Sequence, residues 1–136
     1  MPPQRHFPFV VLEIEAEDLE RARSFYSAVF GWSFADSAVE QGALEAEMVG
    51  DHATVVRVHL RVRDPSVRPP SQIERASRRY GHFLCVRDLT SILHTVVEAG
   101  GRLVAGPTEV PGVGRRLYIL DTEDNEVAVL EPAHAN

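Results

Sequence analysis

The sequence is poor in cysteine and in long apolar runs. Its single cysteine, Cys85, stands among 136 residues, so no disulfide can form within the chain. No apolar run approaches the roughly 20 residues of a membrane-spanning helix. The opening stretch, MPPQRHFPF, lacks the apolar core of a secretion signal. We therefore expect a cytoplasmic protein with no membrane partner.

Positive charge is also scarce. The chain carries 14 Lys and Arg against 20 Asp and Glu, for a net charge of −6. This balance argues against a nucleic-acid partner, which requires a basic face to displace counterions. Two arginine clusters could still form local basic patches, of which we expect the second to be solvated surface: Arg57, Arg61 and Arg63, and Arg75, Arg78 and Arg79. The length and the 44% hydrophobic content are typical of one compact domain spanning residues 1–136.

The most clearly patterned stretch is a closing hairpin. Two strand-like runs, Arg115–Leu120 and Glu126–Leu130, are joined by the polar turn Asp121–Asn125. Arg116 and Tyr118 alternate with aliphatic residues, so they lie on the opposite face of the predicted sheet. The hairpin therefore predicts a sheet with one face on a core and the other free to contact something else.

Similar alternation and helical periodicity run through the rest of the chain. We expect further strands at Phe9–Glu15, Trp32–Phe34, Ala43–Val49, Thr54–Val62, Gly81–Val86 and from Arg102, a turn at 50–52, a short helical turn at 72–79 and a loop over 106–114. Two apolar stripes of helical spacing predict helices from Leu19 to Phe30 and from Leu89 to about Ala99, each opened by an aspartate.

The two halves of the chain repeat each other. Asp18 opens the first helix and Asp88 the second, 70 residues later; Gly31 and Gly101 follow the two helices at the same spacing. The repeat predicts module one at about 9–63, a linker at 64–79 and module two at about 80–132. We expect an α+β fold in which two tandem βαβββ modules form a half-barrel sheet around a central cavity, with the helices outside.

Three runs resemble the vicinal-oxygen-chelate superfamily, which includes glyoxalases, bleomycin-resistance proteins and extradiol dioxygenases. They are AEDLERARSFYSAVFGW at 16–32, VRDLTSILHTVVEAGG at 86–101 and LYILDTEDNEVAVLEP at 117–132. The resemblance covers nearly the whole chain. It implies the same tandem-module fold and a homodimer, as members of the superfamily commonly form.

The resemblance also identifies three positions where members bind a divalent metal. Here they are Val11, Gly81 and Ala128. None of these side chains offers the nitrogen or oxygen donor that such a metal requires. We therefore predict no metal and no cofactor at the usual place. His82 lies beside one position, but a shift of one residue reverses the face of a strand, so we expect it to pack beneath the helices with its ring hydrogen-bonded.

Seven residues are predicted to line the cavity on the faces that carry those positions. They are Val11, Glu13, His59, Phe83, Arg116, Tyr118 and Ala128. Arg116 beside a tyrosine suits an anionic or carbonyl-bearing ligand, although it could instead neutralise Glu13 or Glu126. Glu13 is equally compatible with a salt bridge, and His59 with an ordinary polar or interface position. Cys85 is expected as a core or wall residue. No catalytic residue is assigned.

Three functions remain open at this point. The first is metal-independent binding of a small molecule, by sequestration or sensing, in an apolar pocket with a few polar groups. The second is a lyase- or dioxygenase-type enzyme of the same superfamily that uses a re-sited metal or Glu13 as general base. The third is a structural or interaction role with the dimer itself as the product, in which the face of Arg57, His59 and Arg61 is an interface and not a pocket.

Overall fold

The computed structural model describes residues 9–38, 40–49, 55–66 and 83–133. The linker beyond residue 66, the turns predicted at 50–52 and 72–79, and the residues Gly81 and His82 lie outside this part of the chain.

The first module contains one sheet, called sheet A, and one helix. The elements are β1 (Phe9–Ala16), α1 (Leu19–Phe30), β2 (Ala35–Asp36), β3 (Leu44–Val49) and β4 (Val55–Val62). The strands lie in the order β1-β4-β3-β2, with β1 parallel to β4 and the other pairs antiparallel.

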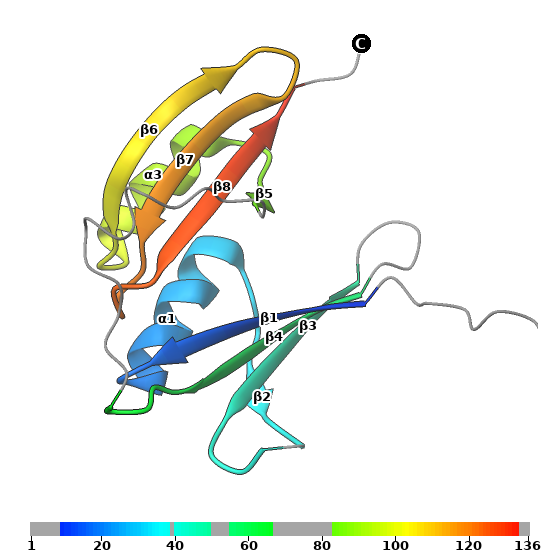
Figure 1. The fold of residues 1–136 in the computed structure, drawn as a ribbon, viewed down its shortest axis with the longest axis vertical. Coiled ribbons are helices and arrows are strands. Elements are labelled where there is room, and N and C mark those ends of the chain that lie inside the picture. The colour runs from blue at the N-terminus through cyan, green and yellow to red at the C-terminus, as the bar shows by residue number, and fades with distance from the viewer. Residues whose placement is uncertain (1–8, 39, 50–54, 67–82, 134–136) are drawn as a thin grey trace, which may run out of the picture.

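The second module repeats this arrangement in sheet B. Its elements are β5 (Leu84–Cys85), α3 (Leu89–Glu98), β6 (Arg102–Val110), β7 (Gly114–Leu120) and β8 (Glu126–Pro132). The strand order β5-β8-β7-β6, with β5 parallel to β8, matches sheet A strand for strand. The predicted α+β fold of two βαβββ modules is therefore confirmed (Figure 1).

Both helices begin where the sequence predicted. The carboxylate of Asp18 accepts a hydrogen bond from the backbone N of Arg21, and Asp88 caps α3 in the same way. Gly31 ends α1 in a left-handed conformation, with φ of 73°. Gly101 has a different role from the one expected, because α3 already ends at Glu98 and the left-handed residue is Gly100.

Gly101 is instead a point of close packing. A Cβ added there would lie 2.6 Å from the carbonyl O of Leu120 and 2.6 Å from Cε2 of Phe25. Only glycine allows α1, α3 and β7 to approach so closely.

Two strands differ in extent from the expectation. β6 continues to Val110, through most of the segment predicted as a loop at 106–114. Its pairing with β7 shifts register on both sides of Ala105, and these irregularities accommodate Pro107 in an edge strand. β2 begins at Ala35, after Trp32, which is buried and stacks on Tyr26.

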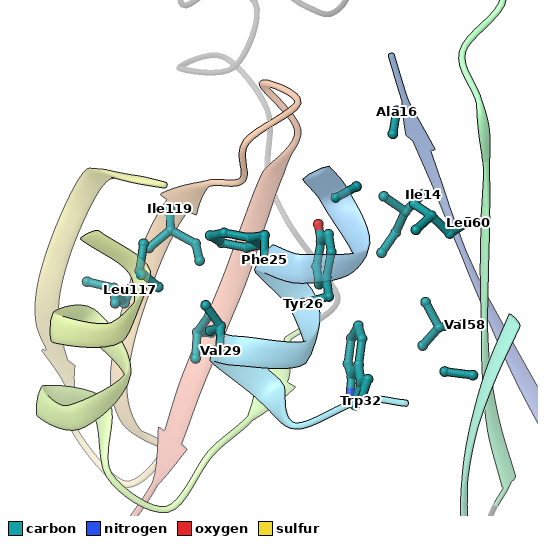
Figure 2. Packing of buried hydrophobic residues seen from close by; sticks show 14 of the residues in the cluster. Ile14, Ala16, Phe25, Tyr26, Val29, Trp32, Val58, Leu60, Leu117 and Ile119 are labelled. Carbon is teal, nitrogen blue, oxygen red and sulfur yellow. The ribbon is translucent and has the colours of Figure 1, made fainter. Parts of the chain in front are cut away.

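The core joins both modules, and α1 lies between the two sheets (Figure 2). Phe25 and Val29 point toward Ile119 of sheet B, while Tyr26 and Trp32 point toward sheet A. α3 contributes Leu89 and Val96 to the same core and packs on sheet B. The helices therefore occupy the inner faces of the sheets, not the outside of a shared half-barrel. The two sheets are separate and no closed barrel is formed by the described strands.

Candidate functional site

Each sheet has a face that no described helix covers, which we call its open face. On sheet A the alternation of β1 and β4 places Val11, Glu13 and His59 on this face, opposite to the core residues Ile14 and Leu60. Glu13 pairs with His59 across the two strands. Three of the seven predicted site residues thus lie together, as the period of two predicted.

The open face of sheet A is a network of charges. Arg61 donates to Glu13 at 3.0 Å and to Glu40 at 3.1 Å. His59 lies with Nε2 2.7 Å from Glu40 and Nδ1 3.4 Å from Glu45. Glu13 and His59 therefore have carboxylate or cation partners within this face, which fits the salt-bridge alternative for Glu13.

Nearby contacts extend the network to the edge of the sheet. Arg57 lies 3.3 Å from Glu47, on the neighbouring strand. Ser37 donates its hydroxyl hydrogen to Glu45 at 2.7 Å, and this bond holds the pKa of the Glu45 carboxyl below its ordinary value.

The open face of sheet B holds the other four predicted residues together with Glu126, which shares the face of Ala128 on β8. Tyr118 pairs with Ala128 across β7 and β8. The rings of Phe83 and Tyr118 lie with centroids 6.3 Å apart, tilted by 49°. The guanidinium carbon of Arg116 lies 5.9 Å from the centroid of the Tyr118 ring, at the outer limit of a cation–π contact. Cys85 is exposed at the sheet's edge.

One chain does not bring these two groups together. Ile14 and Leu60 of sheet A, and Leu117 and Ile119 of sheet B, all contact the common core. The open faces are the reverse sides of those strands, so they point away from the core in opposite directions (Figure 1). The expectation of one cavity lined by all seven residues within a chain is not met, because α1 occupies the space between the sheets.

The residues present do not fit the superfamily's divalent metal. Val11 and Ala128 carry hydrocarbon side chains on different sheets, and Val11 is half-exposed. No three His, Cys, Asp or Glu side chains gather in metal-binding geometry within residues 9–38, 40–49, 55–66 and 83–133. A metal in the usual place would find no side-chain donor at Val11 or Ala128.

Sequence reasoning missed a polar cluster that joins the two modules. We call it the intermodule cluster; its members are Arg21, Tyr26, Arg63, Asp121, Glu123 and Asn125. Asp121 and Asn125 belong to the run LYILDTEDNEVAVLEP that carried the resemblance, but the run gave no indication that these side chains are buried.

The buried carboxylate of Asp121 accepts backbone hydrogen bonds that hold the turn at 121–125. One carboxylate oxygen accepts from the backbone N of Glu123 at 2.7 Å and of Asn125 at 2.8 Å. The other accepts from the hydroxyl of Tyr26 at 2.6 Å. Burial raises the pKa of Asp121 above its ordinary value, and burial together with the Asp121 charge raises that of Tyr26.

Glu123 connects the turn to the first module. Its Oε1 accepts from the backbone N of Glu17 and of Asp18, both at 3.0 Å, and Arg21 donates to Oε2 at 2.6 Å. Burial acts to raise the pKa of Glu123, but the Arg21 bond and the backbone donors outweigh it and the pKa is lowered.

Arg63 is also part of this cluster, not of a basic patch. It is 8% exposed and donates to the carbonyl O of Glu123 and to Oδ1 of Asn125, both at 2.9 Å. The grouping of Arg63 with Arg57 and Arg61 as possible basic surface was therefore wrong for this residue.

Comparison with known proteins fits this architecture. Residues 9–129 match the family model of the Glyoxalase/Bleomycin resistance protein/Dioxygenase superfamily. The chain belongs to this superfamily. Among curated members, the putative glyoxylase CFP32 of Mycobacterium tuberculosis is 23% identical over 81% of this chain. The chain spans only 40% of that relative's length. A glyoxylase-like domain-containing protein of Didymella fabae is 28% identical, and the alignment covers 87% of this chain and 88% of the relative.

Several solved structures share the fold. A glyoxalase family protein from Bacillus cereus has a TM-score of 0.68 at 17% identity, and the superposition covers 98% of this chain and 99% of that protein. TnmS3, an antibiotic binding protein from Streptomyces sp. CB03234, has a TM-score of 0.64 at 21% identity, and the superposition covers 98% of this chain and 100% of TnmS3. No helix in the described part of this superfamily member is long and apolar enough to span a membrane.

Proposed function

We propose that this chain is a small-molecule binding protein of the cytoplasm that works as a homodimer and without a metal. The observation that carries the proposal is the separation of the two open faces. Each presents part of the predicted site, and neither is covered by α1 or α3, the helices that the structure describes. A second copy related by two-fold symmetry would place sheet B of one chain opposite sheet A of the other, twice. Two equivalent pockets would result, each lined by Val11, Glu13 and His59 of one copy and by Phe83, Arg116, Tyr118 and Ala128 of the other.

The composition of these faces supports binding of a small organic molecule. Ligand pockets are mostly apolar with a few polar groups that fix orientation. Sheet B supplies Phe83, Tyr118 and Ala128 as apolar surface, with Arg116 as a polar group. The description of TnmS3 as an antibiotic binding protein shows that a chain of similar fold serves this kind of function.

Enzymatic use of the same faces has less support. The Glu13 carboxylate that would act as general base already accepts a hydrogen bond from Arg61. A metal re-sited on His59 would compete with Glu40 and Glu45, which surround the imidazole. We therefore favour binding, and we expect untagged protein to contain far less than one equivalent of divalent metal by elemental analysis.

The composite pocket is tested with two variants that each damage one wall. Val11→Trp fills the half-exposed position on sheet A, and Arg116→Gln removes the cation from sheet B. A panel of metabolites and antibiotics is first screened for compounds that raise the melting temperature, since a ligand at 100 times its Kd stabilises by about 2.7 kcal/mol. Calorimetry of each hit with each variant follows.

The decisive sample is the heterodimer of the two variants, made by co-expression with two different tags. A shared pocket leaves one of its two sites intact, so we expect wild-type affinity at half the wild-type stoichiometry. A pocket within one chain leaves no intact site, and that result contradicts the proposal. A monomer by light scattering at 50 μM also contradicts it. A dimer for which the panel gives no hit contradicts it as well and favours the interaction role.

A further inference from the structure

The open face of sheet B contains two aromatic rings above a small residue. β8 lies between β5 and β7, and Ala128 is the residue of β8 that pairs with Tyr118. Phe83 immediately precedes β5, and its ring reaches that of Tyr118. Ala128 is only 6% exposed, as expected for a methyl group beneath neighbouring rings. The face therefore offers two adjoining aromatic surfaces that a flat ring system can contact.

Arg116 and Glu126 lie on either side of the Tyr118–Ala128 pair on this face. Arg116 differs from the other arginines of the sheets in its contacts. Arg57 and Arg61 on sheet A each lie within 3.3 Å of a carboxylate, and Arg115 lies 3.0 Å from Glu131. Within the part of the chain that the structure describes, Arg116 is in contact with the Tyr118 ring. Its planar guanidinium can accept an anionic oxygen with paired N–H donors.

The opposite wall of the proposed pocket has the opposite charge. On sheet A five carboxylates, from Glu13, Glu15, Glu40, Glu45 and Glu47, share the face with two guanidinium groups, Arg57 and Arg61, and with His59. Two positive charges against five negative ones leave an excess of three negative charges when the imidazole is neutral. An anionic group on a ligand is therefore repelled by sheet A and attracted by Arg116 of sheet B.

We propose that the ligand is a flat aromatic acid, whose rings pack on Phe83 and Tyr118 and whose acidic oxygen is held by Arg116. The proposal rests on the proposed function, because it names the class of ligand for that pocket. Shape and charge are both required: the rings select a planar compound, and the arginine selects an anion at one edge of it.

Three probes of similar size separate shape from charge. 2-Naphthoate is flat and anionic, 2-naphthamide is flat and neutral, and decalin-2-carboxylate is anionic and puckered. In calorimetry at pH 7.5 with the full chain, we expect 2-naphthoate to bind at least about tenfold more tightly than either of the others, the scale of one charge-assisted hydrogen bond.

Variants identify the residues responsible. Arg116→Gln should lower the affinity for 2-naphthoate by about tenfold or more and leave the affinity for 2-naphthamide within about twofold of wild type. Binding of the amide therefore also reports that the variant is folded. Tyr118→Leu and Phe83→Leu should weaken both flat probes by about threefold to tenfold. The matched control is Arg23→Gln, an exposed arginine of α1 paired with Glu20, and it should change neither affinity.

The outcomes distinguish this inference from the proposed function. Equal binding of the acid and the amide, equal binding of the puckered acid, or an Arg116→Gln variant that weakens both flat probes alike would overturn the inference. If 2-naphthoate does not bind while neutral or cationic compounds from the panel bind in a Tyr118-dependent manner, the inference is wrong and the proposed function stands. If no compound binds at all, the proposed function itself has failed.

Discussion

For single residues, the sequence predicted the face of a strand on which a side chain lies, but not whether a charged side chain is buried. Alternation within a strand correctly predicted which side of the sheet holds Val11, Glu13, Arg116 and Tyr118, because that side follows from the backbone alone. The burial of Arg63 could not be predicted in the same way. It directly follows β4, and its environment is made by the turn at 121–125, some 60 residues away.

The carboxylate of Glu123 should matter for stability more than its place in a polar turn suggests. Glu123→Gln keeps the shape of the side chain but removes the charge that accepts from Arg21 and from two backbone N–H groups. We expect a loss of about 2 kcal/mol in the free energy of unfolding, measured by urea denaturation. Glu20→Gln is the matched control, because its ion pair with Arg23 is exposed and should contribute less than about 0.5 kcal/mol.

The same substitution has a predictable pH dependence. The pKa of Glu123 is lowered in the folded protein, so the folded state binds its proton less readily than the unfolded state does. The stabilisation from Glu123 is therefore fully present above the ordinary carboxyl pKa of about 4.5 and is lost as the pH falls through the lowered value. The difference between wild type and Glu123→Gln should shrink between pH 6 and pH 3. A constant difference across this range would show that the ionised carboxylate is not the stabilising group.

Gly101 provides a test of packing at one atom. Its missing Cβ would meet backbone and ring atoms of Leu120 and Phe25 at 2.6 Å, so Gly101→Ala should cost about 3 kcal/mol. Gly42 is the control: it also tolerates no side chain easily, because its φ is 84°, but a Cβ there meets nothing within 4 Å. Gly42→Ala should cost only about 1 kcal/mol in the same urea experiment. Equal losses would mean that the region around Gly101 can move apart to accept a methyl group.

Helices and strands were predicted with different success. Both helices were located well, since an aspartate cap, an apolar stripe and a following glycine are all local signals. β6 was underestimated because Gly106 and Pro107 normally mark a loop. Its partner β7 supplies the hydrogen bonds that allow the strand to continue past a bulge, and this partner lies elsewhere in the sequence.

The two helix caps offer a comparison within one molecule. Asp18 accepts one backbone hydrogen bond at the start of α1, and Asp88 accepts two at the start of α3. Each aspartate-to-alanine substitution should lower the free energy of unfolding by about 1 kcal/mol. Replacement by serine, which can also cap, should recover most of the loss. Alanine and serine variants of equal stability would show that neither carboxylate is acting as a cap.

At the scale of the whole molecule, the sequence correctly implied two similar modules. It did not reveal how they meet. Each sheet pattern shows one apolar face, but the pattern is the same whether that face lines a shared cavity or packs against a shared helix. The aromatic residues of α1 decide the matter, because Phe25 and Tyr26 point to different sheets (Figure 2).

The shared core and the intermodule cluster predict cooperative unfolding of both modules. The buried contacts of Asp121 and Glu123 cross from module two to module one, so neither module keeps its environment when the other unfolds. We expect a single urea transition, with coincident curves from Trp32 fluorescence in the first module and from a probe attached at Cys85 in the second. Two separated transitions would show that the modules are independent.

The outward direction of the two open faces has a consequence for regulation. A compound that contacts both open faces must contact two chains, so its binding would be thermodynamically linked to the association of the chains. Dilution would then weaken the apparent affinity, and the compound would in turn hold the chains together. In the proposed dimer, the concentration of the protein would thereby set the concentration of compound to which it responds, without any change to a side chain in the pocket.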